Sequence, residues 1–343
     1  MRTITVALGE KTYNIEIAAG LLDQIGAKAR VLSQAVKAAI ISDSNVDPLY
    51  GERLERSLAA SGFEVTRIVF AAGEQSKNLT VLGQVYDELA RAGLTRSDLI
   101  LTLGGGVPGD LGGFAAATFL RGIDFIQVPT SLLAQIDSSV GGKVAIDLPS
   151  GKNLAGSFYQ PKAVFIDPDL LKTLPLRFLH DGLAEAIKYG CIRDAGLFAQ
   201  IAAVKSDQEL LEQADIIIET CCNIKARIVE KDEFDTGERM LLNFGHTIGH
   251  AIEKCCGFTT YTHGEGVGIG MVQMTRQTEK LGLTAAGTAE ELSRVLKKFA
   301  LPVSAVFDAQ EILQAMVLDK KKSGKKINLV IIEKIGVGRL HKI

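Results

Sequence analysis

The sequence predicts an α/β N-terminal domain with a parallel sheet, followed by a mainly α-helical C-terminal domain. Through the first half, short continuous apolar runs alternate with amphipathic segments, which is typical of a parallel sheet covered by helices on both faces. From about residue 170 onward the periodicity is mostly helical. The length of 343 residues fits about two domains of roughly 150 residues each. We place the boundary so that the domains span 1–170 and 171–343.

The elements follow in chain order. Two alternating segments, Arg2–Leu8 and Thr12–Ala18, predict a β-hairpin around a short polar turn. The apolar runs predict parallel strands at Ala38–Ser42, Val65–Phe70, Leu99–Leu103, Phe125–Val128 and Val164–Ile166, with a helix at Leu79–Ala92. Further helices are expected at Glu209–Glu230, Gly268–Lys280 and Ala289–Phe299, and a closing strand pair at Ile327–Ile332 and Val337–His341. No linker of biased composition separates the halves, so we expect direct packing with a cleft between them.

Composition excludes several classes of protein. With 38 basic and 40 acidic residues the net charge is -2, which argues against a nucleic-acid partner that needs a basic surface. No apolar run reaches the roughly 18 residues of a membrane span, and the start has no signal-peptide pattern. Four of the five cysteines form adjacent pairs, Cys221–Cys222 and Cys255–Cys256. Because neighbouring cysteines bridge each other poorly, we expect buried thiols and a reducing cytoplasm.

A glycine cluster at Gly104–Asp110 contains G-x-G-x-x-G between an expected strand and a helix-like segment, Leu111–Phe119. Glycines there let the backbone approach a pyrophosphate, and the helix N-terminus supplies N–H groups. In the standard fingerprint an acidic residue ends the next strand. Here Asp124 lies at the wrong end of that strand, whereas Asp43 closes an earlier one. The pattern predicts a nucleotide site whose adenosine is read by a different strand from the usual one.

Histidines are scarce but clustered. Three of the five, His246, His250 and His263, fall within eighteen consecutive residues, and the first two are spaced i and i+4 on one helix face. Spacing alone predicts three metal ligands of the kind that zinc favours. A carboxylate ligand is also expected, and spacing leaves Glu185, Glu253 and Glu265 open. Glu185 could equally be a surface residue paired with Lys188.

Cationic residues also stand beside glycine, asparagine or apolar residues, unlike those of ordinary charged helix faces. They are Arg121, Lys143, Lys152, Lys188, Lys225 and Arg239. The lysines next to Gly141-Gly142 and before Asn153 predict loops that hold a phosphate or carboxylate. The basic run Lys320–Lys326 has the simpler interpretation of a solvent-exposed loop.

Taken together, these motifs resemble the 3-dehydroquinate synthase family of the shikimate pathway over nearly the whole chain. The matching blocks are Gly73–Lys77 (GEQSK), Gly104–Asp110, Arg121-Gly122, Pro129–Lys143 (PTSLLAQIDSSVGGK), Gly151–Pro161 (GKNLAGSFYQP), Ala184–Gly190 (AEAIKYG), Leu242–Glu253 (LNFGHTIGHAIE) and Asp319–Lys321. Two small departures are Ser131, where the family usually has threonine, and Val144, where threonine is also usual.

The resemblance implies a homodimeric enzyme that uses bound NAD and a divalent metal, zinc or alternatively cobalt. It implies that Glu185, His246 and His263 bind the metal, and that His250 faces the substrate instead. The implied NAD contacts are Asp43, Asn45, Glu74, Lys77, Gly105, Gly106, Val107, Asp110, Thr130, Ser131, Lys143 and Lys152. The implied catalytic and substrate contacts are Arg121, Asp137, Lys143, Lys152, Asn153, Lys188, Lys225, Arg239, Asn243, His250, and Lys320 or Lys321.

The activity that the resemblance implies is that of a phosphorus–oxygen lyase in the biosynthesis of chorismate and the aromatic amino acids. It converts 3-deoxy-D-arabino-heptulosonate 7-phosphate to 3-dehydroquinate and phosphate, through transient oxidation by NAD, phosphate elimination, re-reduction and intramolecular aldol closure. A metal-dependent polyol dehydrogenase of the glycerol-dehydrogenase type is an alternative, but it would not need so many cations. A sister cyclase acting on another sugar phosphate is a second alternative. A non-catalytic NAD- or metal-binding sensor is a third, and it has no use for these acid–base groups.

Overall fold

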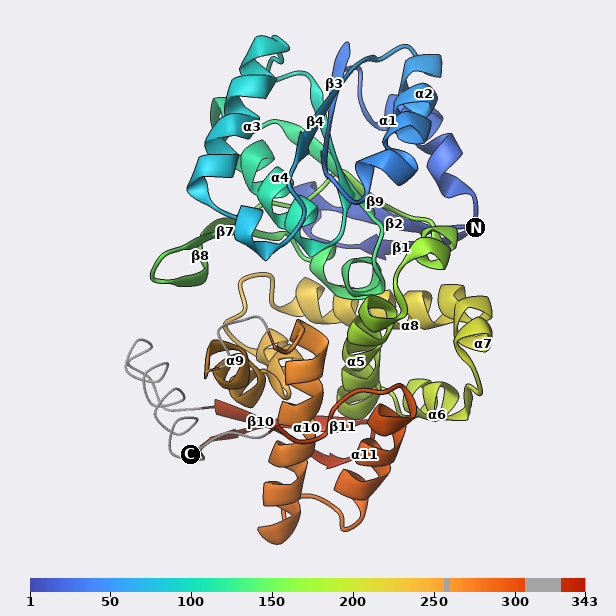
Figure 1. Ribbon diagram of the computed structural model, residues 1–343, viewed down its shortest axis with the longest axis vertical. Helices are drawn as coiled ribbons and strands as arrows, with labels where there is room; N and C mark the ends of the chain where they lie inside the picture. The colour runs from blue at the N-terminus through green and yellow to red at the C-terminus, as the bar shows by residue number, and fades with distance from the viewer. Residues whose placement is uncertain (256–259, 306–327, 343) are drawn as a thin grey trace. The chain divides into compact units, whose positions relative to one another are not determined.

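The computed structural model describes residues 1–255, 260–305 and 328–342, and it shows the α/β sheet domain and the helical second part that the sequence predicts (Figure 1). The chain divides into two compact units. The first contains Met1–Leu174 together with Ala214–Glu230, and the second contains Pro175–Gln213 together with Lys231–Ile343. No helix among the described residues is long and apolar enough to cross a membrane.

The first unit is built on a seven-stranded sheet in the order β1-β2-β9-β6-β5-β3-β4. β1 pairs with β2 antiparallel, and the remaining neighbours pair parallel. The predicted hairpin and the five predicted apolar strands are confirmed. Their bounds are Arg2–Val6 (β1), Tyr13–Ile17 (β2), Lys37–Asp43 (β3), Glu64–Phe70 (β4), Leu99–Gly104 (β5), Asp124–Pro129 (β6) and Ala163–Ile166 (β9).

Helices cover both faces of this sheet, which explains why its central strands β3 and β5 are buried along almost their whole length. Alternate residues of β3 point to opposite faces: Ala38 and Ile40 join one core, and Ala39 and Ile41 join the other. The first core includes residues of α1 (Ile25–Leu32) and α2 (Glu52–Ala60). The second includes residues of α3 (Leu79–Arg91) and α4 (Gly106–Thr118). Figure 1 shows the two helix layers flanking the strands.

Helix α4 begins five residues earlier than the sequence pattern predicted, at Gly106 instead of Leu111. Its first turn contains Pro108, which is tolerated there because the first N–H groups of a helix have no intrahelical partner. Further along α4, a Cβ on Gly112 would lie 2.7 Å from a methyl of Thr102 on β5. Glycine is therefore needed for the close approach of this helix to the sheet.

A second hairpin, β7 (Lys143–Leu148) paired with β8 (Gly151–Phe158), was not predicted. The loops expected to hold an anion around Lys143 and Lys152 are therefore strands. The hairpin was missed because its glycines and the exposed side chains of β8 do not show the usual alternation of apolar and polar residues. Val144 and Ile146 of β7 nevertheless bury one face of the hairpin against α4 and its neighbours.

The predicted helix at Glu209–Glu230 is two helices, α7 (Asp207–Glu212) and α8 (Ala214–Lys231). α8 belongs to the first unit up to Glu230, whereas we expected all residues beyond 170 to form the second domain. Polar contacts explain this. Arg2 of β1 donates to Asp215 at 3.1 and 3.2 Å, and the Ala7 N–H donates to the Glu230 carboxylate at 2.7 Å.

The second unit is mainly helical, as predicted. Its helices and strands are α5 (Leu176–Arg193), α6 (Ala195–Ala203), α7, α9 (His246–Cys255), α10 (His263–Lys280), α11 (Thr288–Lys298), β10 (Asn328–Lys334) and β11 (Val337–Lys342). β10 and β11 form the predicted closing pair. Cys191, Cys221 and Cys222 are buried, as expected, whereas the side chains of Cys255 and Cys256 lie outside the described residues.

Candidate active site

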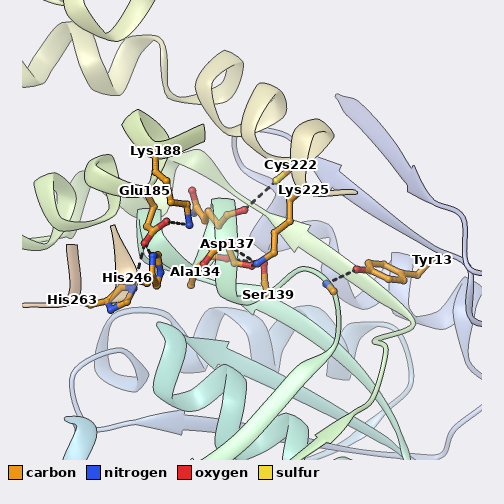
Figure 2. A network of polar contacts seen from close by, with 12 residues as sticks. Tyr13, Ala134, Asp137, Ser139, Glu185, Lys188, Cys222, Lys225, His246 and His263 are labelled. Carbon is orange, nitrogen blue, oxygen red and sulfur yellow. Dashed lines mark hydrogen bonds and ion pairs between the residues drawn. The ribbon is translucent and has the colours of Figure 1, made fainter. Parts of the chain in front are cut away.

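A buried carboxylate forms the centre of the polar cluster in the second unit. Glu185, near the middle of α5, is completely buried, and so is its neighbour Lys188 one turn later. Lys188 forms an ion pair with Oε2 of Glu185, which compensates the cost of burying both charges. The other oxygen, Oε1, lies 3.4 Å from Nε2 of His246 and 3.3 Å from Nε2 of His263 (Figure 2). The two oxygens of this carboxylate therefore have different surroundings.

His246 and His263 each occupy the first position of a helix, α9 and α10 respectively. Nδ1 of His246 lies 3.2 Å from the carbonyl oxygen of Phe244, an arrangement in which Nδ1–H donates and Nε2 keeps its lone pair. Burial lowers the pKa of His246 well below its ordinary value, and the Lys188 ammonium acts in the same direction. The imidazole is thus neutral at pH 7 and able to bind a metal. One ligand atom from each of Glu185, His246 and His263 falls within 4.8 Å of the others.

The structure distinguishes which carboxylate and which histidines lie together, a choice that the sequence spacing left open. Glu265 pairs with Arg177 at 2.9 Å, and the side chain of Glu253 lies outside the described residues. The His250 side chain is exposed, with its ring centroid 5.3 Å from that of His246 and 5.9 Å from that of His263. The cluster that could hold a metal contains Glu185 with His246 and His263, and this is the set that the family resemblance implied.

One buried carboxylate near this cluster was not singled out from the sequence. Asp181 lies one turn before Glu185 on α5 and is 6% exposed. Its Oδ1 accepts a hydrogen bond of 2.6 Å from the Gly264 N–H in the first turn of α10. Burial raises the pKa of Asp181 above its ordinary value. The available sequence signal was a second acidic residue at i−4 from Glu185, which lies on the same side of the helix.

In the first unit, the residues expected to contact NAD follow the carboxyl ends of parallel strands, where open α/β sheets bind nucleotides. Asp43 ends β3, and its carboxylate accepts hydrogen bonds from the Asn45 and Val46 N–H groups at 2.9 and 3.0 Å. Gly105 is the N-cap of α4, so the first N–H groups of that helix are available to an anion. The same edge carries Glu74 and Lys77 after β4, Gly106, Val107 and Asp110 in the first turns of α4, and Thr130 and Ser131 after β6.

Lys77, which follows β4, contacts three other segments of the first unit: α4, β7 and β8. Its nearly buried ammonium donates to Asp110 of α4 at 2.5 Å and to the side-chain oxygen of Asn153 of β8 at 2.6 Å. Its carbonyl oxygen accepts from the Asp147 N–H at 2.7 Å. Burial alone would lower the pKa of Lys77, but the carboxylates of Asp110 and Glu74 raise it above its ordinary value. The ammonium is therefore charged and ties the hairpin β7–β8 to the start of α4.

Asp137 and Lys225, which the family resemblance implied as substrate contacts, also lie together in the first unit. Asp137 belongs to η6 (Ala134–Ser138), and Lys225 belongs to α8. The Lys225 ammonium donates to the Asp137 carboxylate at 2.5 Å and to its backbone carbonyl at 2.6 Å (Figure 2). The nearby Cys222 thiol donates to the carbonyl of Gln135 at 3.2 Å, so α8 is fixed to η6 at two points.

The remaining predicted residues differ in exposure. Arg121 is exposed and has a left-handed backbone (φ +71°), and Lys143 is exposed at the start of β7. Arg239 in η8 (Glu238–Asn243) is buried and donates to the Glu233 carbonyl at 2.6 Å, whereas Asn243 is exposed. Lys152, on β8, lies 4.0 Å from the Glu74 carboxylate. Lys320 and Lys321 lie outside the described residues.

The chain is similar to known proteins over its whole length. The 3-dehydroquinate synthase N-terminal family model matches residues 67–181, and the 3-dehydroquinate synthase C-terminal model matches residues 182–322. A 3-dehydroquinate synthase of Clostridium acetobutylicum is 52% identical, over 100% of this chain and 97% of that protein.

Two solved structures share the fold. A 2-epi-5-epi-valiolone synthase from Streptomyces hygroscopicus with NAD+ and Zn2+ bound has a TM-score of 0.88 at 26% identity, covering 98% of this chain and 94% of that one. A 2-deoxy-scyllo-inosose synthase complexed with carbaglucose-6-phosphate, NAD+ and Co2+ has a TM-score of 0.88 at 24% identity, covering 100% of this chain and 96% of that one.

Proposed function

Because the chain belongs to the 3-dehydroquinate synthase family, we propose how its described residues convert 3-deoxy-D-arabino-heptulosonate 7-phosphate to 3-dehydroquinate and phosphate. The observation that carries this proposal is the Glu185 carboxylate, buried on α5, with two imidazole nitrogens within 3.4 Å of one of its oxygens. Such a set of one oxygen and two nitrogen donors is typical of a catalytic metal site that keeps a coordination position for substrate.

The donor set suits a divalent metal, and we propose Zn²⁺, with Co²⁺ as the alternative. Glu185, His246 and His263 would hold it. When bound, the metal would polarise an oxygen of the substrate as a Lewis acid. The chain's own contribution is orientation. Lys188 holds Oε2 of Glu185, and the Phe244 carbonyl holds Nδ1 of His246, so each ligand presents a defined atom.

The edge of the parallel sheet suits NAD, since α4 begins at a glycine N-cap and Asp43 ends a neighbouring strand. We assign the pyrophosphate to the N–H groups of Gly105, Gly106 and Val107, and a ribose to Asp43. When bound, NAD would accept a hydride from the substrate and return it, so it would not be consumed. Lys77 and Asp110 would brace this edge through the ion pair already present between them.

The substrate carries a carboxylate and a phosphate, and we assign the contacts with these anions to Arg121, Lys143, Lys152, Lys188, Lys225 and Arg239. Of these, Lys225 is oriented by Asp137. Arginine and lysine bind such anions through charge-assisted hydrogen bonds. We assign the exposed His250 beside the metal-ligand cluster to a substrate hydroxyl, where it would accept or donate a proton.

The proposal is tested by following phosphate and NADH together. The protein is incubated with the heptulosonate phosphate, Zn²⁺ and NAD at a small fraction of the substrate concentration. We expect complete release of phosphate with no accumulation of NADH, and no reaction with glycerol. Stoichiometric NADH formation on a polyol without phosphate release would contradict the proposal and favour a dehydrogenase.

We also propose that the chain is a cytoplasmic homodimer, as expected from the family resemblance. Sedimentation equilibrium of the purified protein tests the dimer directly, and a monomer at micromolar concentration would contradict it.

A further inference from the structure

Helix α5 carries three charged residues at intervals of four: Arg177, Asp181 and Glu185. This spacing places them along one side of the helix. Two of them contact the start of α10, the helix that begins with His263. The third, Glu185, lies 3.3 Å from the imidazole of His263 itself. The relative position of α5 and α10 therefore sets the distance between two of the proposed metal ligands.

The contact made by Asp181 is buried and short. Its Oδ1 accepts 2.6 Å from the N–H of Gly264, which directly follows His263. This N–H is one of the first four in α10, which have no carbonyl partner within their own helix. A buried carboxylate that accepts from such a group makes a charge-assisted bond, and losing it would leave a buried donor unsatisfied.

Gly264 shows how closely the two helices approach. A Cβ built on this glycine would lie 2.0 Å from the backbone carbonyl oxygen of Asp181 and 2.8 Å from its Oδ1. No larger residue fits without separating α10 from α5. The start of α10 is therefore fixed against α5 at Asp181, one turn from Glu185.

The pair formed by Arg177 and Glu265 also links α5 to α10, but it is exposed to solvent. Arg177 donates two hydrogen bonds of 2.9 Å to Glu265, but its side chain is 56% exposed. Exposed ion pairs contribute little because water and salt screen them. Arg177 thus links the same two helices as Asp181 without a buried contact, and it serves as a matched control.

We propose that Asp181 is a positioning residue that fixes the start of α10 so that His263 and Glu185 stand at the separation a metal ion requires. This inference rests on the metal site of the proposed function. It assigns Asp181 no contact with substrate, NAD or metal. Its effect passes through the backbone of Gly264 to the neighbouring His263.

The test measures metal affinity in the full-length protein without substrate. Apo protein is titrated with Zn²⁺ against a chelating indicator, for wild type, Asp181→Ala, Asp181→Asn and Arg177→Ala. A group that hydrogen-bonds a metal ligand directly is typically worth about 10- to 100-fold in metal affinity. Because Asp181 acts through the backbone of Gly264, we expect a loss at the lower end of this range, about 10-fold, for Asp181→Ala, and a change of less than about threefold for Arg177→Ala. Asp181→Asn should lie between Asp181→Ala and wild type, because its amide oxygen still accepts the Gly264 N–H.

A spectroscopic readout separates positioning from a general loss of stability. In Co²⁺-loaded protein, Asp181→Ala should show an altered visible absorption spectrum, since the coordination geometry changes. Circular dichroism identifies variants that fold, and if Asp181→Ala does not fold, Asp181→Asn carries the comparison. Wild-type affinity and spectrum in Asp181→Ala, or equal losses in Asp181→Ala and Arg177→Ala, would overturn the inference. Failure of the wild type to bind Zn²⁺ would instead overturn the metal site of the proposed function.

Discussion

The two units have polar clusters of opposite character. The cluster in the first unit is centred on the nearly buried ammonium of Lys77, whereas the cluster in the second unit is centred on the buried carboxylate of Glu185. The Lys77 cluster (Lys77, Asp110 and Asn153) pairs a donor with acceptors, and each partner comes from a different segment. The Glu185 cluster gathers one carboxylate oxygen and two imidazole nitrogens, all of which can offer lone pairs to a cation. From this difference we infer that the first cluster braces the fold through its own ion pair, and we propose that the second binds a metal.

The largest expected effect on stability concerns the Lys77 cluster, and it tests whether this cluster braces the fold. Lys77→Met removes the cation beside Asp110, whose side chain is only 16% exposed. Removing one partner of a buried pair typically costs about 3–5 kcal/mol, because the other charge is left uncompensated. We expect a loss of that size in the free energy of unfolding, measured by urea denaturation without NAD or metal.

The matched control is Lys162→Met. Its ion pair with Asp124 is about half exposed, and we expect a loss below about 1 kcal/mol. The double variant Lys77→Met/Asp110→Leu should recover part of the loss, since it removes both charges. If Lys77→Met costs no more than Lys162→Met, the Lys77 cluster does not brace the fold.

A smaller effect on stability is expected at Asp98, a carboxylate of the first unit that accepts hydrogen bonds from backbone N–H groups and a hydroxyl. Burial would raise the pKa of Asp98, but hydrogen bonds from the Lys37 and Thr95 backbone and the Thr95 hydroxyl outweigh it and lower this pKa. A depressed folded-state pKa contributes stability above the unfolded pKa, and this is lost as the pH falls through the folded value. We expect Asp98→Asn to cost about 1–2 kcal/mol at pH 7.

The pH dependence of this cost is the test. Urea denaturation of both proteins should give a constant difference between pH 7 and pH 5, which shrinks below about pH 4 as the carboxylate takes up a proton in the wild type. A difference that grows on acidification would show that the hydrogen bonds do not hold the charged form.

Much of the fold could be predicted from the sequence because its signals are local. Strands such as Leu99–Gly104 are mostly apolar and buried throughout, since both faces of the sheet are covered. The start of α4 was misplaced because glycine and proline are poor helix formers, yet Pro108 fits a first turn. The position of α8 could not be predicted, because Asp215 finds its partner Arg2 more than two hundred residues away.

The site shows the same limit. Spacing treats His250 and His263 alike and leaves three glutamates open, because the choice depends on which side chains the packing of α5, α9 and α10 brings together. The resemblance to a family supplied the set that the structure groups, Glu185 with His246 and His263. Asp181 was missed because its partner, Gly264, is 83 residues away.

The most direct test of the account compares two histidines of this cluster. His263→Ala and His250→Ala are purified, loaded with Zn²⁺, dialysed and analysed for zinc and for phosphate release. We predict about one zinc per chain in wild type and in His250→Ala, and almost none in His263→Ala, with turnover lost in both variants. Equal loss of zinc from the two variants would contradict the assignment of His263 to the metal and His250 to the substrate.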